Sequence, residues 1–497
     1  MFGQIPRASL DSPASSVPLC VDLDGTLVRS DTLLDLALVL ARQNPRKILS
    51  IPGWIAQGKA AFKRHLIQYA TLDVAALPYN RPLLEFCQAE HDQGRQLYLA
   101  TAADSGLAQR VADHCGFFDG VLGSDGAHNL AGENKLAAFR QRFGEDFCYI
   151  GNASADLPIL RVCREPMVAN PTAGLMAGLR ASHTVPARIF RDQAPPFQAW
   201  MKAIRLHQWA KNTLIFLPLL LAHAWRSPGS AFGAVVAFFA FGLCASGTYI
   251  LNDLLDIEAD RRHHTKQRRP FAAGHLSPLR GVLVIALFLA LAAMLAVAVP
   301  YVVAHFGTPL RPAFGLLAWL LIYALTTISY SLALKRLVLV DVIVLSGLYT
   351  IRIIAGAAAT GVPVSTWLAG FSVFFFLSLA FVKRFAELES LKLRGKAPTN
   401  GRGYHLEDLE QLRSFGTTAA YASVVVLTLY ISSLDERLYR HPVRLWLLLP
   451  VLLLWVSQLW LLASRGELHE DPVVYAITDR RSLLLGVVVL VIVILAL

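Results

Sequence analysis

The sequence predicts two fold classes in one chain: an N-terminal α/β domain with a helical cap, and a C-terminal all-α membrane domain of nine transmembrane helices. Three observations predict this division. The chain has 497 residues, which is enough for two domains. It is 55% hydrophobic and only 16% charged, whereas soluble domains average about 25% charged residues. Short apolar runs ending in polar loops occupy its first part, and stretches long enough to span a membrane occupy the rest.

The N-terminal part alternates strand-like and helix-like segments, as in a parallel sheet covered by helices. A helical insertion at about 31–79 separates the first two strand-like runs, and we expect it to cap the sheet. The predicted strands are Leu19–Leu23, Gln96–Thr101, Gly120–Gly123, Phe147–Gly151 and Met167–Asn170. The predicted domains are a polar tail at 1–18, the α/β domain at 19–185, a linker at 186–201 and the membrane domain at 202–497.

Apolar stretches of spanning length follow one another through the C-terminal part. The first contains Pro218, so we expect it to be tilted or broken. The nine predicted spans lie near 212–225, 231–251, 281–303, 313–332, 338–360, 364–382, 415–433, 443–463 and 482–497.

Charge and cysteine placement predict the topology. Lys and Arg concentrate in the loops after the second, fourth, sixth and eighth spans, which places these loops in the cytosol. The tail at 1–18 has no apolar signal segment, and the six cysteines show no C-x-x-C spacing, as expected of reduced cytosolic thiols. We therefore expect a multi-pass protein of the cell inner (plasma) membrane, with its α/β domain and functional loops in the cytosol. The net charge of +11 then reflects topology and headgroup attraction, not nucleic-acid binding.

The first predicted strand ends in a D-x-D-G-T motif whose acids are Asp22 and Asp24. Carboxylates at i and i+2 project into the crevice beyond the strand end, where open α/β sheets bind ligands. Asp22 is predicted to attack phosphorus, while Asp24 protonates the leaving oxygen and then activates water. Thr101 would donate to a phosphoryl oxygen, Lys135 would neutralise developing charge, and Asp156 would complete a Mg²⁺ site with Asp22.

In chain order, these residues and the string from Asn152 to Asp156 resemble the four motifs of the haloacid dehalogenase (HAD) superfamily of phosphatases. The resemblance covers 19–185 and implies a Rossmannoid sheet with a helical cap. It also implies that Mg²⁺ is the cofactor, held by Asp22, Asp24, Asn152 and Asp156. Asn152 stands where the family has an acid, so its carbonyl would hold the ion with less charge. The alternative is an inactive domain kept for scaffolding or regulation.

A row of acidic residues ends the second predicted span. Asn252, Asp253, Asp256 and Asp260 fall within about a 100° arc of a helix with 3.6 residues per turn. At the membrane boundary these charges would repel one another and lose hydration. Bound Mg²⁺ carrying a diphosphate would relieve both costs. We therefore predict that Asp253, Asp256 and Asp260 are catalytic metal ligands and that Asn252 is a further metal ligand.

Basic residues follow the row and recur at other predicted cytosolic helix ends. Most single Lys or Arg residues in such places set topology. We expect Arg352 and Lys266 to be exceptions. Arg352 lies inside a predicted membrane span, where an unpaired charge is costly. Cations opposite an acidic helix face would orient and neutralise a Mg²⁺-phosphate substrate.

The C-terminal part resembles the UbiA superfamily of intramembrane prenyltransferases, whose first acidic box has the form N-D-x-x-D-x-x-x-D. Aromatic prenyltransferases of the superfamily carry a second acidic box, but here the corresponding region has one acid, Asp341. The strings around Asn252, Tyr330 and Lys383 resemble instead the polyprenyl-phosphate phosphoribosyltransferase branch, typified by decaprenyl-phosphate phosphoribosyltransferase. The resemblance implies substrate-binding roles for Asn252, Lys266, Arg268, Arg269, Tyr330, Lys335, Asp341, Arg352, Lys383 and Arg384.

By that resemblance, the membrane half would transfer 5-phosphoribose from phosphoribosyl diphosphate (PRPP) to a polyprenyl phosphate and release diphosphate. We hypothesise that the HAD-like domain then removes the 5-phosphate of the product, giving a pentose donor for cell-envelope synthesis. The expected partners are the polyprenyl phosphate lipid, PRPP or another diphosphate-bearing substrate, and the membrane. Assembly into a homo-oligomer is compatible with the sequence.

Two rival functions remain. A UbiA-type enzyme could attach a prenyl diphosphate to an aromatic or quinone precursor, with a regulatory or inactive HAD-like domain, although the single acid of the second region argues against this. A transporter or lipid-binding scaffold would carry internal repeats and polar residues at mid-bilayer, whereas here the acidic row lies at one edge.

Overall fold

The computed structural model describes residues 17–124, 130–307, 314–393, 395, 403–433, 439–468 and 471–497. The chain packs as two units: residues up to Ala203 together with Ile250–Leu283, and Ile204–Tyr249 together with Val284–Leu497. The N-terminal unit therefore contains both the α/β domain and the segment that carries the acidic row. The predicted polar tail lies outside the described residues except for its last two positions.

A six-stranded parallel sheet forms the centre of the N-terminal unit, in the order β3-β2-β1-β4-β5-β6. All five predicted strands are confirmed, and β6 is an addition inside the segment predicted as a linker. The strands are β1 (Leu19–Val21), β2 (Leu97–Asp104), β3 (Gly120–Ser124), β4 (Cys148–Gly151), β5 (Pro166–Ala169) and β6 (Arg188–Phe190). Strand β1 is central, pairing Leu19 with Leu97 on one side and with Cys148 on the other.

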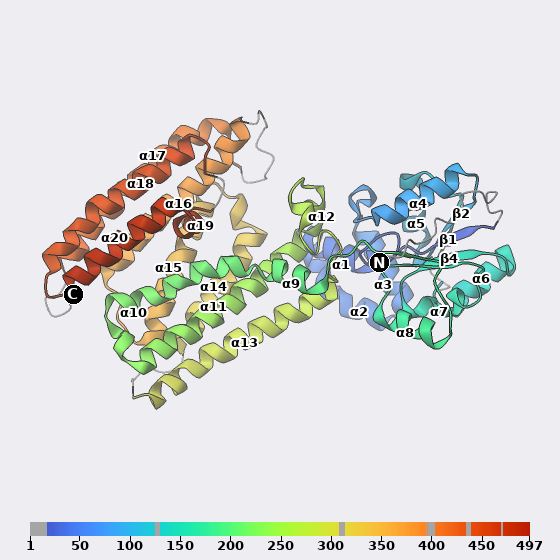
Figure 1. Ribbon diagram of the computed structural model, residues 1–497, viewed down its shortest axis with the longest axis horizontal. Helices are drawn as coiled ribbons and strands as arrows, with labels where there is room; N and C mark the ends of the chain where they lie inside the picture. Colours follow the sequence, from blue (N-terminus) through green and yellow to red (C-terminus); the bar gives the residue numbers. More distant parts are fainter. Residues whose placement is uncertain are drawn as a thin grey trace, which may run out of the picture. The chain divides into compact units, whose positions relative to one another are not determined.

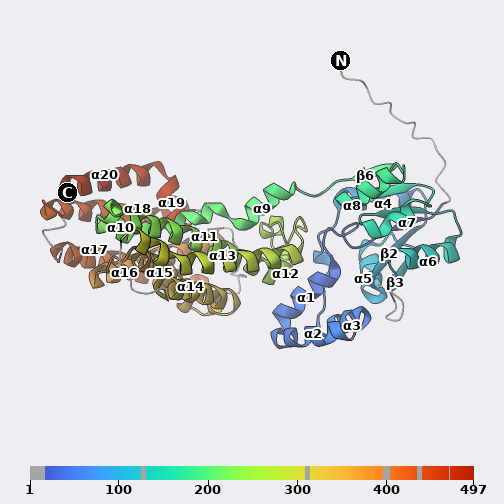
Figure 2. The same cartoon turned by 90° about the horizontal axis from the view of Figure 1, so that it is seen from below.

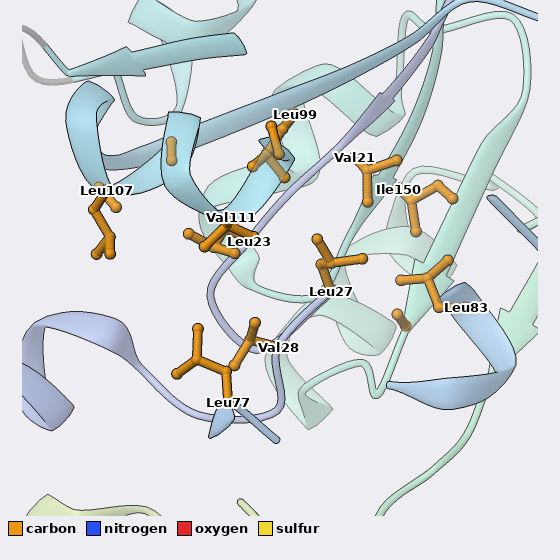
Figure 3. Close-up of a cluster of buried hydrophobic side chains, with 14 of the residues drawn as sticks. Val21, Leu23, Leu27, Val28, Leu77, Leu83, Leu99, Leu107, Val111 and Ile150 are labelled. Atoms are coloured by element: carbon orange, nitrogen blue, oxygen red, sulfur yellow. The ribbon is translucent and has the colours of Figure 1, made fainter. Parts of the chain in front are cut away.

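Helices cover both faces of this sheet (Figure 1). On one face, Val21 and Leu99 pack with Leu107 and Val111, and Figure 3 shows this cluster. On the other face, Cys20 is buried in a second cluster. Burial of each such Val or Leu stabilises the fold by about 1.5–3 kcal/mol. The helices of the first face are α4 (Arg81–Asp92) and α5 (Ser105–Cys115); those of the second are α6 (Glu133–Phe143), α7 (Leu157–Leu160) and α8 (Ala173–Ala181).

The insertion predicted as a cap is helical, as expected. It contains α1 (Thr32–Gln43), α2 (Ile51–Ala56) and α3 (Lys59–Tyr69), which lie together outside the sheet in Figure 2. Asp31 caps α1 by accepting hydrogen bonds from two backbone amides of its first turn. The ring of Trp54 stacks on the ring of Tyr69, with 5.8 Å between centroids, and joins α2 to α3.

Seven helices among the described residues are long and apolar enough to cross a membrane. The predicted count of nine is not confirmed. The first predicted span is interrupted near Pro218 and forms the 3₁₀ segment η4 (Leu206–Phe216) and the short α10 (Leu217–Leu221). The ninth corresponds to α20 (Arg480–Ala496), which has 17 residues. The seven are Pro228–Leu255, Pro278–His305, Gly315–Leu332, Val340–Thr360, Thr366–Leu393, Leu406–Ser432 and Pro442–Ser464.

Small residues allow close helix packing in the C-terminal unit, as is usual between membrane helices. A Cβ added to Gly356 of α15 (Val340–Thr360) would lie 2.1 Å from the backbone oxygen of Ile215 in η4. A Cβ added to Gly416 would lie 2.2 Å from the ring of Trp460. Close approach of η4 to α15 brings polar side chains of both elements together inside the apolar bundle.

Candidate functional site

The D-x-D-G-T loop follows β1 directly and holds the first predicted acid in a fixed position. The ammonium group of Lys135, on α6, donates to Oδ1 of Asp22 at 2.8 Å, and the hydroxyl of Thr26 donates to its Oδ2 at 3.2 Å. Burial raises the pKa of Asp22, although the neighbouring ammonium group opposes the shift. Lys135 is therefore an orienting partner of the predicted nucleophile, and both side chains are buried.

The second acid of the motif, Asp24, accepts a hydrogen bond from the backbone amide of Thr32 at 2.7 Å. Burial, reinforced by the charge of Asp31, raises the pKa of Asp24 to about 7. A carboxyl group with this pKa carries a proton in part of the molecules at neutral pH. Its environment therefore suits the predicted role of general acid and base.

Tyr149 joins two predicted site residues and was not found from the sequence. Its hydroxyl donates to Oδ1 of Asp156 at 2.7 Å and accepts from the ammonium group of Lys135 at 3.0 Å. The other oxygen of Asp156 accepts from the backbone amides of Asn152 and Ala153. Within the described contacts, Asp156 thus shapes the turn after β4 and fixes Tyr149. Its predicted metal-binding role stays a prediction. The only sequence signal for Tyr149 is its place on β4, two residues before Gly151.

Asn152 reaches the D-x-D-G-T loop at Gly25. The backbone of Gly25 has a φ of 75°, and a Cβ added there would lie 2.0 Å from Nδ2 of Asn152. The loop glycine thus allows the amide to pack against the loop that carries both acids. The carboxylate oxygens of Asp22 and Asp24 and the amide oxygen of Asn152 are the type of ligand that Mg²⁺ prefers. Among the described residues, no three His, Cys, Asp or Glu side chains form a metal-binding group, either here or at the acidic row, so metal binding at both places stays a prediction.

A cavity of about 180 Å³ opens beside Asp24. Cap side chains line it, among them Leu36 and Lys63, whose ammonium group donates to the carbonyl oxygen of Ala102 at 2.7 Å. Nearby on β2, the hydroxyl oxygen of Thr101 accepts from the amide of Ala103 at 3.0 Å, which leaves the hydroxyl proton to donate elsewhere. The cavity is smaller than typical ligand pockets of about 300–1,000 Å³, so it suits the phosphorylated end of a substrate.

The acidic row lies at the end of α11 (Pro228–Leu255) and in α12 (Ile257–Arg262). Helical hydrogen bonds continue through the junction, because the amide of Asp256 donates to the Asn252 carbonyl and the amide of Asp260 to the Asp256 carbonyl. One guanidinium nitrogen of Arg269 lies 3.1 Å from Asp253 and 2.7 Å from Asp260. Arg269 therefore bridges Asp253 and Asp260, whereas Asp256 lies 3.5 Å from a guanidinium nitrogen of Arg42 on α1. Metal binding by the row stays a prediction.

Two consecutive arginines after the row form ion pairs with the α/β domain. Arg261 makes a bidentate pair with Asp35 of α1, at 2.8 and 3.2 Å, and these side chains are 3% and 0% exposed. Arg262 pairs with Asp73 at 2.8 Å, and those side chains are 58% and 32% exposed. The two pairs have the same chemistry but differ in burial, so they give a matched test of what burial contributes.

We expect Asp35→Ala to destabilise the protein far more than Asp73→Ala. Removing Asp35 leaves the Arg261 charge buried without its carboxylate, which costs about 3–5 kcal/mol, whereas an exposed pair contributes about 0–1 kcal/mol. Thermal unfolding of the purified protein in detergent should show a Tm decrease of roughly 10 °C for the first variant and no more than about 3 °C for the second. Equal decreases would contradict the structural role of the buried pair.

A second cationic cluster lies in the C-terminal unit. The ammonium groups of Lys211, on η4, and Lys383, on α16 (Thr366–Leu393), each donate to Oδ2 of Asp471 at 2.9 Å. Tyr349 of α15 donates to Oδ1 of the same carboxylate at 3.2 Å. Burial is outweighed by the two ammonium groups, which hold the pKa of Asp471 below its usual range. Lys211 and Asp471 were not found from the sequence, because they are far apart along the chain and meet only in the fold.

Arg352 lies buried on α15, as its predicted role requires. Its guanidinium donates to the side-chain oxygen of Asn212 at 2.9 Å, to the hydroxyl of Tyr323 at 3.0 Å and to the carbonyl of Leu348 at 2.5 Å. All three acceptors are neutral, and no carboxylate pairs with Arg352 within the part of the chain that the structure describes. A buried cation with neutral acceptors favours the binding of an anion beside it.

Two predicted substrate-binding residues bind each other. A guanidinium nitrogen of Arg384 lies 2.7 Å from Oδ2 of the fully buried Asp341, and Arg384 also pairs with Glu387. The hydroxyl of Tyr404 donates to Oδ1 of Asp341. Substrate contacts of Asp341 and Arg384 stay predictions. Of the other predicted binding residues, Tyr330 lies in the last turn of α14 (Phe314–Leu332) and Lys335 in η7 (Leu334–Arg336). Lys266 and Arg268 lie in η6 (Lys266–Arg268).

Comparison with known proteins places these sites in two families. Residues 19–161 match the model of the haloacid dehalogenase-like hydrolases. Residues 213–484, more than half of the chain, match the model of the UbiA prenyltransferase family. The chain belongs to the UbiA prenyltransferase family. It is an integral membrane protein with an HAD-like domain at its N-terminus.

Relatives of this UbiA protein match either almost the whole chain or a part of it. The uncharacterized protein y4nM of Sinorhizobium fredii is 36% identical over 97% of this chain and 91% of its own length. Decaprenyl-phosphate phosphoribosyltransferase of Mycobacterium tuberculosis is 32% identical over 47% of this chain and 67% of its own. A UbiA homologue from Archaeoglobus fulgidus, solved bound to GPP and Mg²⁺, is 15% identical in sequence and superposes with a TM-score of 0.44. The match covers 59% of this chain and 99% of the homologue.

Proposed function

We propose that the membrane domain of this UbiA protein transfers 5-phosphoribose from PRPP to a polyprenyl phosphate, and that its HAD-like domain then removes the 5-phosphate. One observation supports the first step: Asp253, Asp256 and Asp260 follow one another at helical spacing at the end of α11 and in α12, and Arg269 bridges Asp253 and Asp260. Such a row is suited to a substrate that brings divalent cations and phosphate together. The named M. tuberculosis relative supports phosphoribose as the group transferred.

In the transfer step, an oxygen of the lipid phosphate attacks C1 of the ribose, and the bond from C1 to the diphosphate oxygen breaks. Asp253, Asp256, Asp260 and Asn252 would hold Mg²⁺, which when bound neutralises the charge of the departing diphosphate. Arg269 and Lys266 would bind phosphate oxygens beside the row. Arg352, Lys335 and Lys383 would bind phosphates of donor and acceptor, and the apolar helices would accommodate the isoprenoid chain at about 0.8 kcal/mol per buried CH₂.

In the hydrolytic step, an oxygen of Asp22 attacks the phosphorus of the 5-phosphate while Asp24 gives its proton to the ribose oxygen. Asp24 then takes a proton from water, which cleaves the phosphoaspartate and releases inorganic phosphate. Lys135 holds Asp22 in position at 2.8 Å. Thr101 would donate its hydroxyl proton to a phosphoryl oxygen, and Asp22, Asp24, Asn152 and Asp156 would hold Mg²⁺ in this domain. Because both domains belong to one chain, the phosphatase meets the lipid product at high effective concentration.

We place both steps at the cytosolic face of the inner membrane. The concentration of Lys and Arg in alternate loops supports this orientation. The dephosphorylated product would be a polyprenyl-phosphoryl ribose, suited to donate pentose to envelope glycans.

A comparison of donors tests the proposal. Purified protein supplied with PRPP, polyprenyl phosphate and Mg²⁺ should release diphosphate and then inorganic phosphate. Prenyl diphosphate with 4-hydroxybenzoate should give no turnover. Turnover of the second pair together with none of the first would replace the proposal by an aromatic prenyltransferase activity.

A further inference from the structure

A cationic pocket of about 430 Å³ lies in the N-terminal unit, apart from the cavity beside Asp24. Three segments build it. The α/β domain provides Arg29 and Arg81, helix α9 (Pro196–Ile204) provides Lys202, and the loop after the acidic row provides Arg268 and His275. Neither proposed reaction uses Arg29, Arg81 or Lys202.

The lining carries excess positive charge. Its four Arg and Lys side chains face one carboxylate, Asp192, so three positive charges remain uncompensated among the described lining residues. Asp192 is already engaged by the Arg29 guanidinium at 3.2 Å and by the backbone amide of Arg81 at 3.3 Å. His275 adds no charge at neutral pH, because burial and the nearby Arg29 lower its pKa and its Nδ1 accepts from the amide of Ala194 at 3.3 Å.

The packing around Arg29 holds the pocket walls together. The Arg29 side chain also donates to the carbonyl of Pro78 at 3.4 Å. The loop touches it at Gly274, where the backbone has a φ of 72° and an added Cβ would lie 2.8 Å from Cβ of Arg29. The buried pair of Arg261 with Asp35 fixes the same loop to the α/β domain. Arg29 is thus fixed by the fold before any ligand binds, which lowers the cost of binding to it, while Arg81, Lys202 and Arg268 are exposed at the pocket.

We infer that this pocket binds a small phosphate-bearing anion with at least two negative charges, of the diphosphate or phosphorylated-sugar class, and that it does so without a metal ion. Its volume lies in the range of about 300–1,000 Å³ for small-molecule sites. Three uncompensated cations match a multiply charged anion, and guanidinium groups bind phosphate oxygens in pairs. The acidic row and the cavity beside Asp24, in contrast, present carboxylates, which repel such an anion unless cations are bound.

Removing divalent cations weakens diphosphate binding at the carboxylates of both proposed active sites, and the site variant identifies the binding that remains in this pocket. We would measure binding of inorganic diphosphate by calorimetry to the full-length protein in nanodiscs of zwitterionic lipid, with EDTA present and no transfer substrate. The site variant is Arg81→Gln/Lys202→Gln. The control variant, Arg161→Gln/Arg180→Gln, removes the same charge from exposed positions outside the pocket lining.

The wild type and the control variant should bind diphosphate with equal affinity. The site variant should bind it at least about tenfold more weakly, because each lost hydrogen bond to a charged group reduces the affinity by about tenfold. No binding by the wild type, or equal weakening in both variants, would overturn the inference. Nanodiscs containing phosphatidylglycerol distinguish the source of the phosphate: loss of diphosphate binding there would assign the pocket to a lipid headgroup and overturn its assignment to a small molecule. Since no transfer or hydrolysis is measured, failure here leaves the proposed function standing.

Discussion

Replacing Asp22 by Asn should abolish release of inorganic phosphate while leaving release of diphosphate intact. The amide cannot attack phosphorus, and the buried ammonium group of Lys135 loses the carboxylate that it contacts at 2.8 Å. Loss of a nucleophile lowers turnover by roughly a thousandfold or more. The measurement is the time course of diphosphate and inorganic phosphate released from PRPP and polyprenyl phosphate. The variant should release diphosphate but no inorganic phosphate.

Asp146→Asn is the matched control for this variant. Asp146 lies in the same domain, and its ion pair with Arg164 is exposed, with 63% and 62% of the two side chains accessible. The control should release both products at the wild-type rate. Persistent phosphate release in Asp22→Asn would show that the HAD-like domain does not catalyse the second step.

The second large effect is expected at the acidic row. Asp256→Asn should lower diphosphate release by about a hundredfold or more, because one negative charge of the row is lost where cations and diphosphate must bind. The phosphatase should retain its activity on a small soluble phosphate ester, since the catalytic groups around Asp22 are unchanged. Both activities are measured on the same preparation.

Glu258→Gln provides the comparison. It removes one carboxylate from the same segment, but Glu258 pairs with Arg262 and lies outside the predicted row. This control should keep most of the transferase activity. If both variants lost diphosphate release to the same degree, the loss of any negative charge from this segment would explain the effect. The position of Asp256 in the row would then have no catalytic role of its own.

Strand and helix positions could largely be predicted because their signals are local. Each of the five predicted strands is an apolar run that ends at a polar loop, and all five lie in the sheet. Strand β6 was missed because it has three residues, two of them exposed, in a stretch rich in Arg and Pro. The count of nine spans is not confirmed, because the first stretch is broken near Pro218, as expected, and α20 has only 17 residues.

The acidic row was predictable and its partners were not. Helical hydrogen bonds continue through Asp256, so the 3.6-residue period correctly placed Asp253 and Asp260 on one side. The contact of Arg269 with both depends on the path of the loop, which no local pattern fixes. Lys211 and Asp471 are harder still, because they meet only through tertiary packing.

The mass of the lipid product tests the central claim most directly. Wild-type protein incubated with PRPP and polyprenyl phosphate should yield the lipid phosphate plus one pentose, whereas Asp22→Asn should accumulate the same lipid with one further phosphate group. Absence of any pentose adduct from both preparations, with Mg²⁺ and both substrates supplied, would contradict phosphoribosyl transfer by this membrane domain.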